Sequence, residues 1–165
     1  MDVLTFRGYI GSGVGRYSEM TIPGRAALPD APNDWPETLQ SGSLNVKIAS
    51  DGYPNELLSR CNGELVQKLD SQVFCPTFEI PRNAIQNNKL KPEPDQPRRG
   101  DAQVWRAALL VPDRQVPFDC WVLRRFGSRV KEQLEIVSDK HLRTELGLVD
   151  GANVVVHLYG TWEPA

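Results

Sequence analysis

Side chains with oxygen or ammonium groups occupy every second position of a short stretch near the first third of the chain. Polar and apolar residues alternate there in the order Ser43, Leu44, Asn45, Val46, Lys47 and Ile48. Successive side chains of a β-strand point to opposite faces, so the pattern predicts a strand that buries one row and presents the other. The presented row offers two neutral oxygen ligands and an ammonium group, which suit a magnesium ion and its phosphates. An amphipathic strand with an ordinary solvated face has the same pattern.

A glycine-rich stretch, Gly11-Ser12-Gly13-Val14-Gly15, precedes this strand and is followed by Arg16. Glycine lets the backbone adopt positive φ and approach a ligand closely, and successive N–H groups in such a loop can converge on an anion. Arg16 adds a positive charge at the same place. Ile22-Pro23-Gly24 soon interrupts any helix, which disfavours a Rossmann or Walker-type loop. A structural turn between two strands is the alternative interpretation.

The composition is that of an ordinary globular chain. The 165 residues carry a formal net charge of −2, and 40% of them are hydrophobic, which predicts one domain over residues 1–165. The charge gives no long-range attraction to nucleic acid or anionic membrane, and no apolar run reaches membrane-spanning length. Cys61, Cys75 and Cys120 are widely spaced and predict free thiols in a reducing compartment, hence a cytoplasmic protein without a signal peptide.

Short alternating segments separated by turn residues dominate the rest of the chain. Strands are expected at residues 3–10, 43–48, 73–80, 103–111, 118–123, 134–137 and 153–159. Two short helices are expected at residues 54–58 and 139–147, the second capped by Ser138 or Asp139 and ended by Gly147. This inventory predicts a mainly β fold, a closed antiparallel barrel of six or seven strands with a few short helices.

Two long connections interrupt this pattern. Residues 23–40 are rich in Pro and Asp, and residues 83–101 form a proline-rich surface excursion that is either mobile or packed as an irregular flap. The four tryptophans are expected to pack in the protein rather than stack on a ligand. The adjacent residues Arg124 and Arg125 are expected to be a solvated pair.

Three segments, taken in order, resemble the archaeal CTP-dependent riboflavin kinases, a cradle-loop β-barrel family. They are Gly8-Tyr9-Ile10-Gly11-Ser12-Gly13-Val14-Gly15, Gly42-Ser43-Leu44-Asn45-Val46-Lys47 and Leu142-Arg143-Thr144-Glu145-Leu146-Gly147-Leu148-Val149-Asp150-Gly151. The resemblance covers most of the chain in outline, and residues 60–102 match least. Order and spacing carry it, because no single motif is diagnostic.

The resemblance implies a nucleotide site built from all three segments. It assigns the nucleotide phosphates to Ser12, Gly13, Val14, Gly15 and Arg16. It assigns Mg²⁺ to the hydroxyl of Ser43 and the amide oxygen of Asn45, where Ser replaces the family's Thr and keeps the hydroxyl. The base and sugar fall to Lys140, His141, Leu142 and Arg143.

On the acceptor side, the resemblance implies flavin contacts from Ser128 and Glu132. Glu132 stands at the family's Glu position, but Gly127 stands where a Thr is expected, with Ser128 as the nearest hydroxyl. Arg129 and Asp139 replace a common His and a common Pro, and the glycine loop is shorter than the family's usual form. These departures cluster on the acceptor side, so a changed acceptor or a lost activity is one consequence to test.

The expected function is phosphoryl transfer from CTP or another nucleoside triphosphate to riboflavin, giving FMN. Such transfer relies on positioning and charge neutralisation, which Mg²⁺, the loop amides, Arg16 and Lys47 would supply. Glu132 would orient or deprotonate the acceptor hydroxyl. The alternative is a non-catalytic nucleotide- or flavin-binding barrel or a partner module, while nucleic-acid binding is disfavoured. The oligomeric state is left open.

Overall fold

The computed structural model describes residues 1–11, 21–40, 44–60, 69, 73–128 and 132–164. The predicted phosphate-binding residues Ser12, Gly13, Val14, Gly15 and Arg16 lie outside the described residues, as does Ser43.

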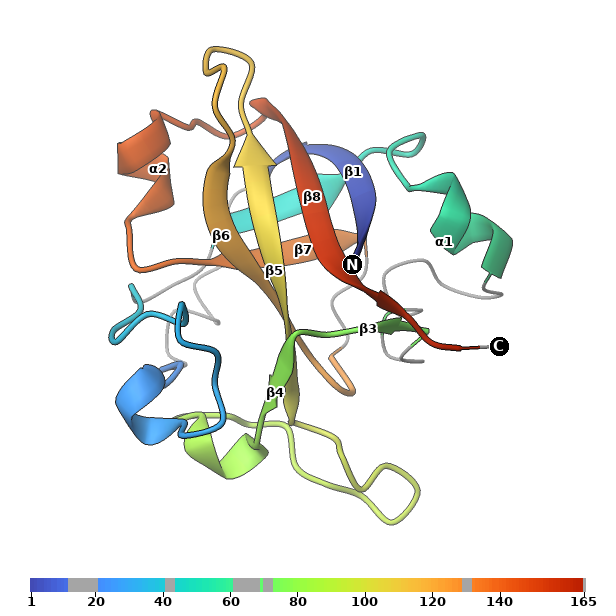
Figure 1. Cartoon of the computed structure of the whole chain (residues 1–165), viewed down its shortest axis with the longest axis vertical. Helices are drawn as coiled ribbons and strands as arrows, with labels where there is room; N and C mark the ends of the chain where they lie inside the picture. The colour runs from blue at the N-terminus through green and yellow to red at the C-terminus, as the bar shows by residue number, and fades with distance from the viewer. Residues whose placement is uncertain (12–20, 41–43, 61–68, 70–72, 129–131, 165) are drawn as a thin grey trace.

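Six antiparallel strands close into a barrel (Figure 1). In order around the barrel they are β8 (Asn153–Trp162), β1 (Asp2–Ile10), β2 (Leu44–Ile48), β7 (Gln133–Val137), β6 (Phe118–Arg125) and β5 (Ala102–Leu110). Pairing of β5 with β8, with Arg106 opposite Tyr159, completes the ring. Closure removes the unpaired edges that an open sheet would expose. The predicted closed barrel of six or seven strands is therefore confirmed.

The barrel interior is filled by alternate residues of each strand. In β1, Leu4 and Phe6 have no exposed surface, while Val3 before them and Thr5 between them are exposed. The inward rows of the other strands contribute the same kind of side chain; the buried set includes Val46, Trp105, Leu109, Val122, Leu134, Ile136, Val156 and Leu158. Burying each such side chain stabilises the fold by about 1.5–3 kcal/mol.

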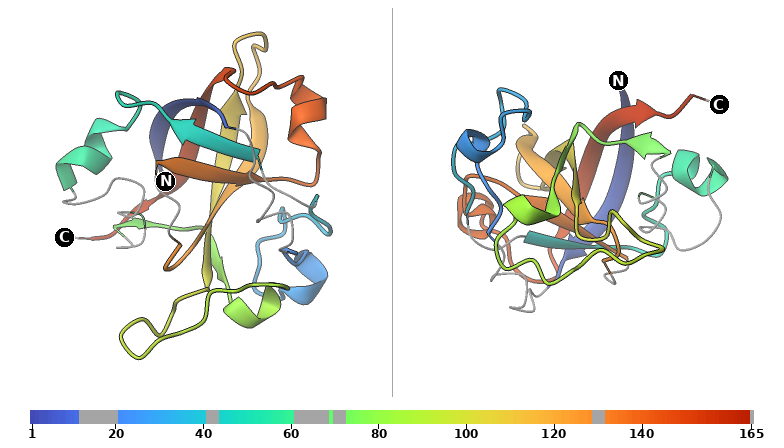
Figure 2. Two further views of the ribbon diagram at one scale, coloured as in Figure 1. Left: turned by 180° about the vertical axis from the view of Figure 1, so that it is seen from behind. Right: turned by 90° about the horizontal axis from the view of Figure 1, so that it is seen from below.

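A second apolar cluster lies on the outer face of β5 and β6, where the segment 21–40 packs (Figures 1 and 2). Trp35 is its centre and is completely buried. Its ring lies edge-on to Phe78 and to Trp121, with both centroid distances 5.0 Å, and its Nε1 donates to the carbonyl of Pro23 at 3.0 Å. The connection at residues 23–40 is thus fixed to the barrel wall by a tryptophan, in accord with the packing role expected for it.

The strand expected over residues 73–80 is divided in two. β3 (Phe74–Cys75) pairs with β8, whereas β4 (Phe78–Ile80) pairs with β5. Pro76 lies between them and has no N–H to continue a ladder, so the chain changes partner strand at this residue. Both short strands lie outside the closed barrel.

Two α-helices are found in the described part of the chain, α1 (Asn55–Arg60) and α2 (Leu142–Leu146). Gly147 ends α2 with φ of 61°, a left-handed conformation that glycine adopts without strain, as expected. The N-cap of α2 is His141, so the cap predicted at Ser138 or Asp139 is wrong. The Ser138 hydroxyl instead accepts a hydrogen bond from the N–H of Lys140 at 3.1 Å, which turns the chain one residue before the cap.

The excursion over residues 83–101 is packed as an irregular flap against the end of β6, and it begins with the 3-10 turn η4 (Arg82–Ala84). Asn88 donates to the carbonyl of Gly100 at 2.8 Å and accepts from Arg125 Nη1 at 2.9 Å. Arg124 and Arg125 are only 6% and 8% exposed. The solvated pair predicted for them is therefore wrong, because the flap covers Arg125 and supplies its hydrogen-bond partner.

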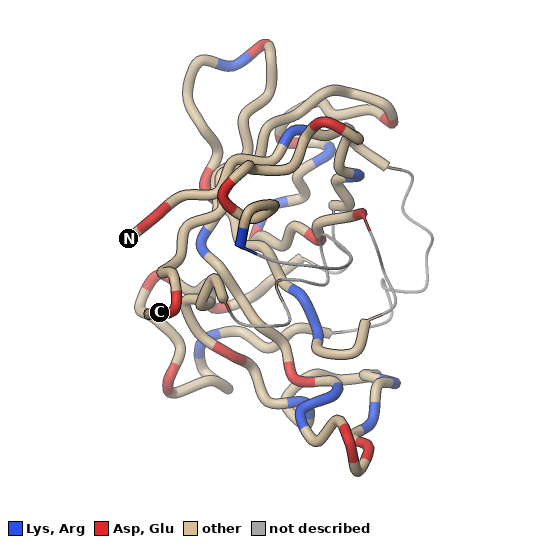
Figure 3. Tube along the Cα trace, turned by 90° about the vertical axis from the view of Figure 1, so that its right-hand side faces the viewer, with Lys and Arg blue, Asp and Glu red and all other residues tan. Residues whose placement is uncertain are grey.

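Acidic and basic positions are interspersed along the trace (Figure 3). In the residues that the structure describes, no helix combines the length and the apolar character needed to cross a membrane.

Candidate functional site

The outer face of β2 meets the start of the glycine-rich stretch. Gly11 follows β1 directly, and its N–H donates to the carbonyl of Asn45 at 2.9 Å. A Cβ at Gly11 would lie 3.0 Å from both Cγ and Cε of Lys47, so the Lys47 side chain runs closely over this glycine. A larger residue here would require the lysine side chain to shift by a few tenths of an ångström. Lys47 and Asn45 are therefore both beside the root of the glycine-rich stretch.

Arg143 brings the third predicted segment to the same place. Its Nη2 donates to the carbonyl of Gly11 at 2.9 Å and to Asp150 Oδ1 at 2.6 Å. Residues 132 positions apart in the chain thus meet directly. The structure brings together Gly11, Asn45, Lys47 and Arg143, one or more from each segment that carried the family resemblance.

Asn45 departs from its predicted exposure. The alternating pattern predicted a presented side chain, but Asn45 is only 6% exposed. Among the described residues, no donor lies within hydrogen-bonding distance of its Oδ1 atom. Buried polar atoms normally have a partner, and leaving one without costs about 1–3 kcal/mol. A buried amide oxygen of this kind fits a cation or a ligand donor, which is the chemistry that Mg²⁺ demands of its ligands.

Glu135 lies directly opposite Asn45 in the β2–β7 ladder. The carbonyl of Asn45 accepts a hydrogen bond from the N–H of Gly11, so the backbone polar groups of Asn45 point toward β1 and away from β7. Asn45 and Glu135 are therefore a non-hydrogen-bonded pair of the antiparallel ladder. Such pairs have Cα atoms about 4.5 Å apart and side chains on one face. Glu135 was not predicted as a site residue, although the alternation of residues 133–137 could have indicated it. It places a carboxylate-bearing residue opposite Asn45 and on the same face as Lys47.

Glu132 lies elsewhere, at the other end of β2. Its carbonyl accepts from the N–H of Ile48 at 2.8 Å, and its carboxylate accepts a hydrogen bond from the hydroxyl of Tyr53. The Tyr53 ring packs edge-on against Phe6 of the barrel interior, with centroids 6.3 Å apart. Glu132 has φ of 58°, unusual for a residue with a Cβ and often found at functional positions. Three residues along a strand span about 10 Å, so Glu132 and Asn45 are not neighbours.

The backbone conformation and the close approach of Arg99 explain why position 127 is glycine. Gly127 has φ of 80°, and a Cβ there would lie 2.6 Å from Cγ of Arg99. The threonine expected at this position would therefore require Arg99 to move. Ser128 follows in the same turn, where its carbonyl lies 3.4 Å from Nη2 of Arg124.

The other residues predicted to meet the base and sugar differ in exposure. Leu142 is 5% exposed and its side chain packs in the barrel core. Lys140 and His141 are exposed. His141 Nδ1 lies 2.7 Å from the hydroxyl of Thr144, one turn into α2.

A pocket of about 410 Å³ opens at a different place, on the outer face of β5, β6 and β8. None of the predicted site residues that the structure describes lines it. Its lining residues are Asp34, Pro36, Arg106, Ala107, Asp119, Cys120, Trp121, Ser138, Asp139 and Tyr159. Burial and the neighbouring Asp119 raise the pKa of the Cys120 thiol to about 12, so this sulfur is a protonated packing group at neutral pH.

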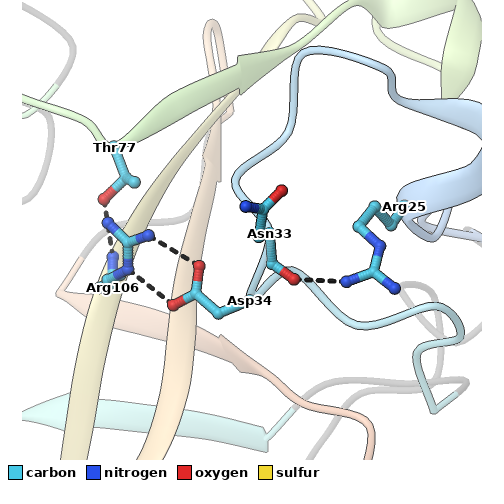
Figure 4. A network of polar contacts seen from close by, with 5 residues as sticks. All are labelled: Arg25, Asn33, Asp34, Thr77 and Arg106. Atoms are coloured by element: carbon cyan, nitrogen blue, oxygen red, sulfur yellow. Dashed lines mark hydrogen bonds and ion pairs between the residues drawn. The ribbon is translucent and has the colours of Figure 1, made fainter.

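A two-pronged ion pair borders this pocket (Figure 4). Arg106 Nε and Nη2 donate to the two carboxylate oxygens of Asp34 at 2.8 and 2.7 Å. These hydrogen bonds lower the pKa of Asp34 and raise the pKa of Arg106. The Arg106 guanidinium also lies over the Trp121 ring, 5.4 Å from its centroid. The pair ties the segment 21–40 to β5.

We expect Asp34→Asn to lower the free energy of unfolding by about 0.2–1 kcal/mol at pH 7, because both side chains are more than one-third exposed and the pair is screened. The folded-state pKa of Asp34 is lowered, so the stabilisation is present above its unfolded pKa near 3.8 and is lost as pH falls through the folded value. Urea unfolding of wild type and Asp34→Asn from pH 7 downward should therefore converge at acidic pH. Asp51→Asn, which removes the looser Arg7–Asp51 pair at 3.6 Å, is the matched control and should change little. A constant difference at all pH values would contradict this account.

Comparison with known proteins assigns no family. No protein-family model matches the chain, and no curated protein sequence matches it.

Proposed function

We propose that this protein is a phosphotransferase of the CTP-dependent riboflavin kinase type. It would transfer the γ-phosphoryl group of CTP, or of another nucleoside triphosphate, to riboflavin and give FMN. The observation that carries the proposal is the buried Oδ1 atom of Asn45, which has no donor among the described residues and lies beside the root of the glycine-rich stretch.

Asn45, together with Ser43, would hold Mg²⁺. The bound ion would neutralise phosphate charge, so neutral protein ligands suffice when the nucleotide brings the negative charge. Among the described residues, no group of three or more His, Cys, Asp or Glu side chains is arranged to hold a metal. A magnesium site here would therefore take its protein ligands from Asn45 and Ser43 and its negative charge from the substrate.

Lys47 would supply the second positive charge. Its aliphatic chain lies over Gly11, the first residue of the glycine-rich stretch. An ammonium group acts as a point charge on phosphate oxygens without a demand for fixed geometry. Because the protein does little covalent chemistry in phosphoryl transfer, this placement is its main contribution.

Two carboxylates, Glu132 and Glu135, are candidates to bind riboflavin or to orient and deprotonate its hydroxyl, and their positions favour different roles. Glu132 is bonded to Tyr53 and lies at the far end of β2, where with Ser128 it would bind the flavin. Glu135 is opposite Asn45, on the face that carries Lys47, and so is nearer to the proposed triphosphate. We therefore assign the orienting or deprotonating role to Glu135 and acceptor binding to Glu132.

Paired variants test this division. Glu135→Gln should lower kcat by about a hundredfold or more, since a positioned general base contributes about 10²–10⁴-fold. Glu132→Gln should chiefly raise the riboflavin KM, by about tenfold, because a hydrogen bond to a charged group is lost. Steady-state kinetics with varied riboflavin separates the two. The reverse pattern would return the base role to Glu132.

A non-catalytic nucleotide- or flavin-binding barrel is the second candidate. The conformation of Gly127 favours it, because the threonine expected on the flavin side cannot be accommodated without moving Arg99. Such a barrel would bind its ligand and leave it unchanged.

One experiment separates the two functions. Purified protein is incubated with riboflavin, Mg²⁺ and each nucleoside triphosphate in turn, and FMN is detected by chromatography. We expect FMN with CTP, and less with ATP or GTP. Nucleotide or flavin binding without FMN would leave the non-catalytic barrel; binding of neither would exclude both.

A further inference from the structure

Ile10 and Gly11, where the chain leaves β1 and enters the glycine-rich stretch, have all of their backbone polar groups bonded. The N–H of Ile10 donates to the carbonyl of Ala152 at 2.9 Å, and its carbonyl accepts from Gly151 at 2.8 Å. Together with the bond from the N–H of Gly11 to β2, these contacts fix three of the four groups by backbone alone.

The fourth group, the carbonyl of Gly11, depends on a side chain. Gly11 is buried, and Arg143 Nη2 donates to its oxygen at 2.9 Å. The same nitrogen donates to Asp150 Oδ1 at 2.6 Å, which orients the guanidinium. Removing the arginine would leave a buried carbonyl without this donor.

Arg143 is itself held firmly at its backbone. Its carbonyl accepts from the N–H of Leu148 at 2.8 Å, across the turn that Gly147 makes at the end of α2. The arginine therefore links the α2 turn to the point where the chain leaves β1.

We infer that Arg143 is a positioning residue that acts through Gly11: with Asp150 orienting its guanidinium, it fixes the carbonyl of Gly11 at the point where the chain leaves β1. The inference rests on the proposed function, in which the residues after Gly11 bind the phosphates. It differs from a direct contact between Arg143 and the base or sugar of the nucleotide. Two measurements separate these roles, and the first requires no nucleotide.

The first measurement is amide hydrogen exchange in the protein without ligand. Arg143→Ala should accelerate exchange of the Gly11 and Gly151 amides by about tenfold or more, because a charge-assisted bond at their junction is lost. Arg114→Ala is the matched control, since Arg114 Nη2 donates to the carbonyl of Glu145 in α2 at 2.9 Å without reaching Gly11. This control should leave both amides unchanged. Unchanged exchange in Arg143→Ala would overturn the inference.

Milder variants guard against loss of folding. Asp150→Asn keeps an acceptor but removes the charge, and Arg143→Lys keeps a charged donor on a shorter arm. Each should accelerate the same two amides less than Arg143→Ala does. Full wild-type protection in both variants would also overturn the positioning role.

The second measurement compares Mg²⁺·CTP with Mg²⁺·tripolyphosphate by calorimetry. A residue that acts through Gly11 affects phosphate recognition, so Arg143→Ala should weaken both ligands by a similar factor, about tenfold. Loss of affinity for CTP alone would show a base or sugar contact and overturn the inference. Failure of wild type to bind either ligand would reject the proposed function, while the exchange result would still decide the role of Arg143.

Discussion

Asn45→Ala should abolish Mg²⁺-dependent nucleotide binding and leave the stability of the fold nearly unchanged. The substitution removes the buried amide oxygen that would hold the metal with the nucleotide. It also removes an oxygen whose burial without a donor costs about 1–3 kcal/mol, which offsets the loss of packing. We therefore expect nucleotide affinity in Mg²⁺ to fall by at least about a hundredfold, while the free energy of unfolding changes by less than about 1 kcal/mol.

Calorimetric titration with CTP, with and without Mg²⁺, measures the first effect, and urea unfolding measures the second. Asn153→Ala is the control, because Asn153 is an exposed asparagine at the start of β8. It should alter neither quantity. If Asn45→Ala bound CTP as wild type does in Mg²⁺, the metal assignment would be wrong. A large loss of stability would indicate instead that Asn45 is a structural residue.

Trp35→Ala should produce the largest loss of stability of the substitutions considered. Trp35 has no exposed surface and lies between Phe78 and Trp121, with both ring centroids 5.0 Å away. Truncation of a buried tryptophan leaves a cavity and costs about 3–5 kcal/mol. It also removes the hydrogen bond to the carbonyl of Pro23. Because this side chain fixes the segment 21–40 to the barrel wall, the segment should become accessible to protease.

Denaturant unfolding and limited proteolysis test the Trp35 prediction together. Trp162→Ala is the comparison, since Trp162 is only partly buried against Phe74 and should cost less. A stability loss below about 1 kcal/mol for Trp35→Ala would mean that the outer cluster contributes little. Cleavage within residues 21–40 at the wild-type rate would contradict the anchoring role.

The fold was predictable because the alternation of residue types is local information. The pattern from Leu44 to Ile48 identifies β2, and Gly147 identifies the end of α2. The change of partner strand at Pro76 was only partly predictable. Proline marks where a ladder stops, but the partner of each half depends on which strands already lie beside it.

Burial on the outer face was not predictable in the same way. Alternation distinguishes the two faces of a strand but gives no sign that the outer face is covered, as it is at Asn45. Arg125 is covered because its partner, Asn88, lies 37 residues away in the flap. Contacts over such separations depend on tertiary packing, which the local pattern does not encode.

In the candidate site, too, some features were predictable from the sequence and others depended on tertiary packing. The order of the three segments predicted that Gly11, Asn45 and Arg143 belong together, and the structure brings them into contact. Assigning roles to the two carboxylates required the register of the β2–β7 ladder, which the sequence alone does not define. The family resemblance pointed to Glu132 alone, but only the ladder places Glu135 opposite Asn45, and only the tertiary fold gives Glu132 the hydroxyl of Tyr53.

The pairing of β1 with β8 has a consequence for synthesis of the chain. Asp2 is opposite Gly160, and β8 also closes the ring against β5. A chain emerging from the ribosome therefore carries β1 with one side unpaired until β8 has also been made. Contacts of such sequence separation slow folding and leave strand edges open to other chains during that interval. The barrel is protected at its edges only once it is complete, so its nascent chain is the form most exposed to aggregation.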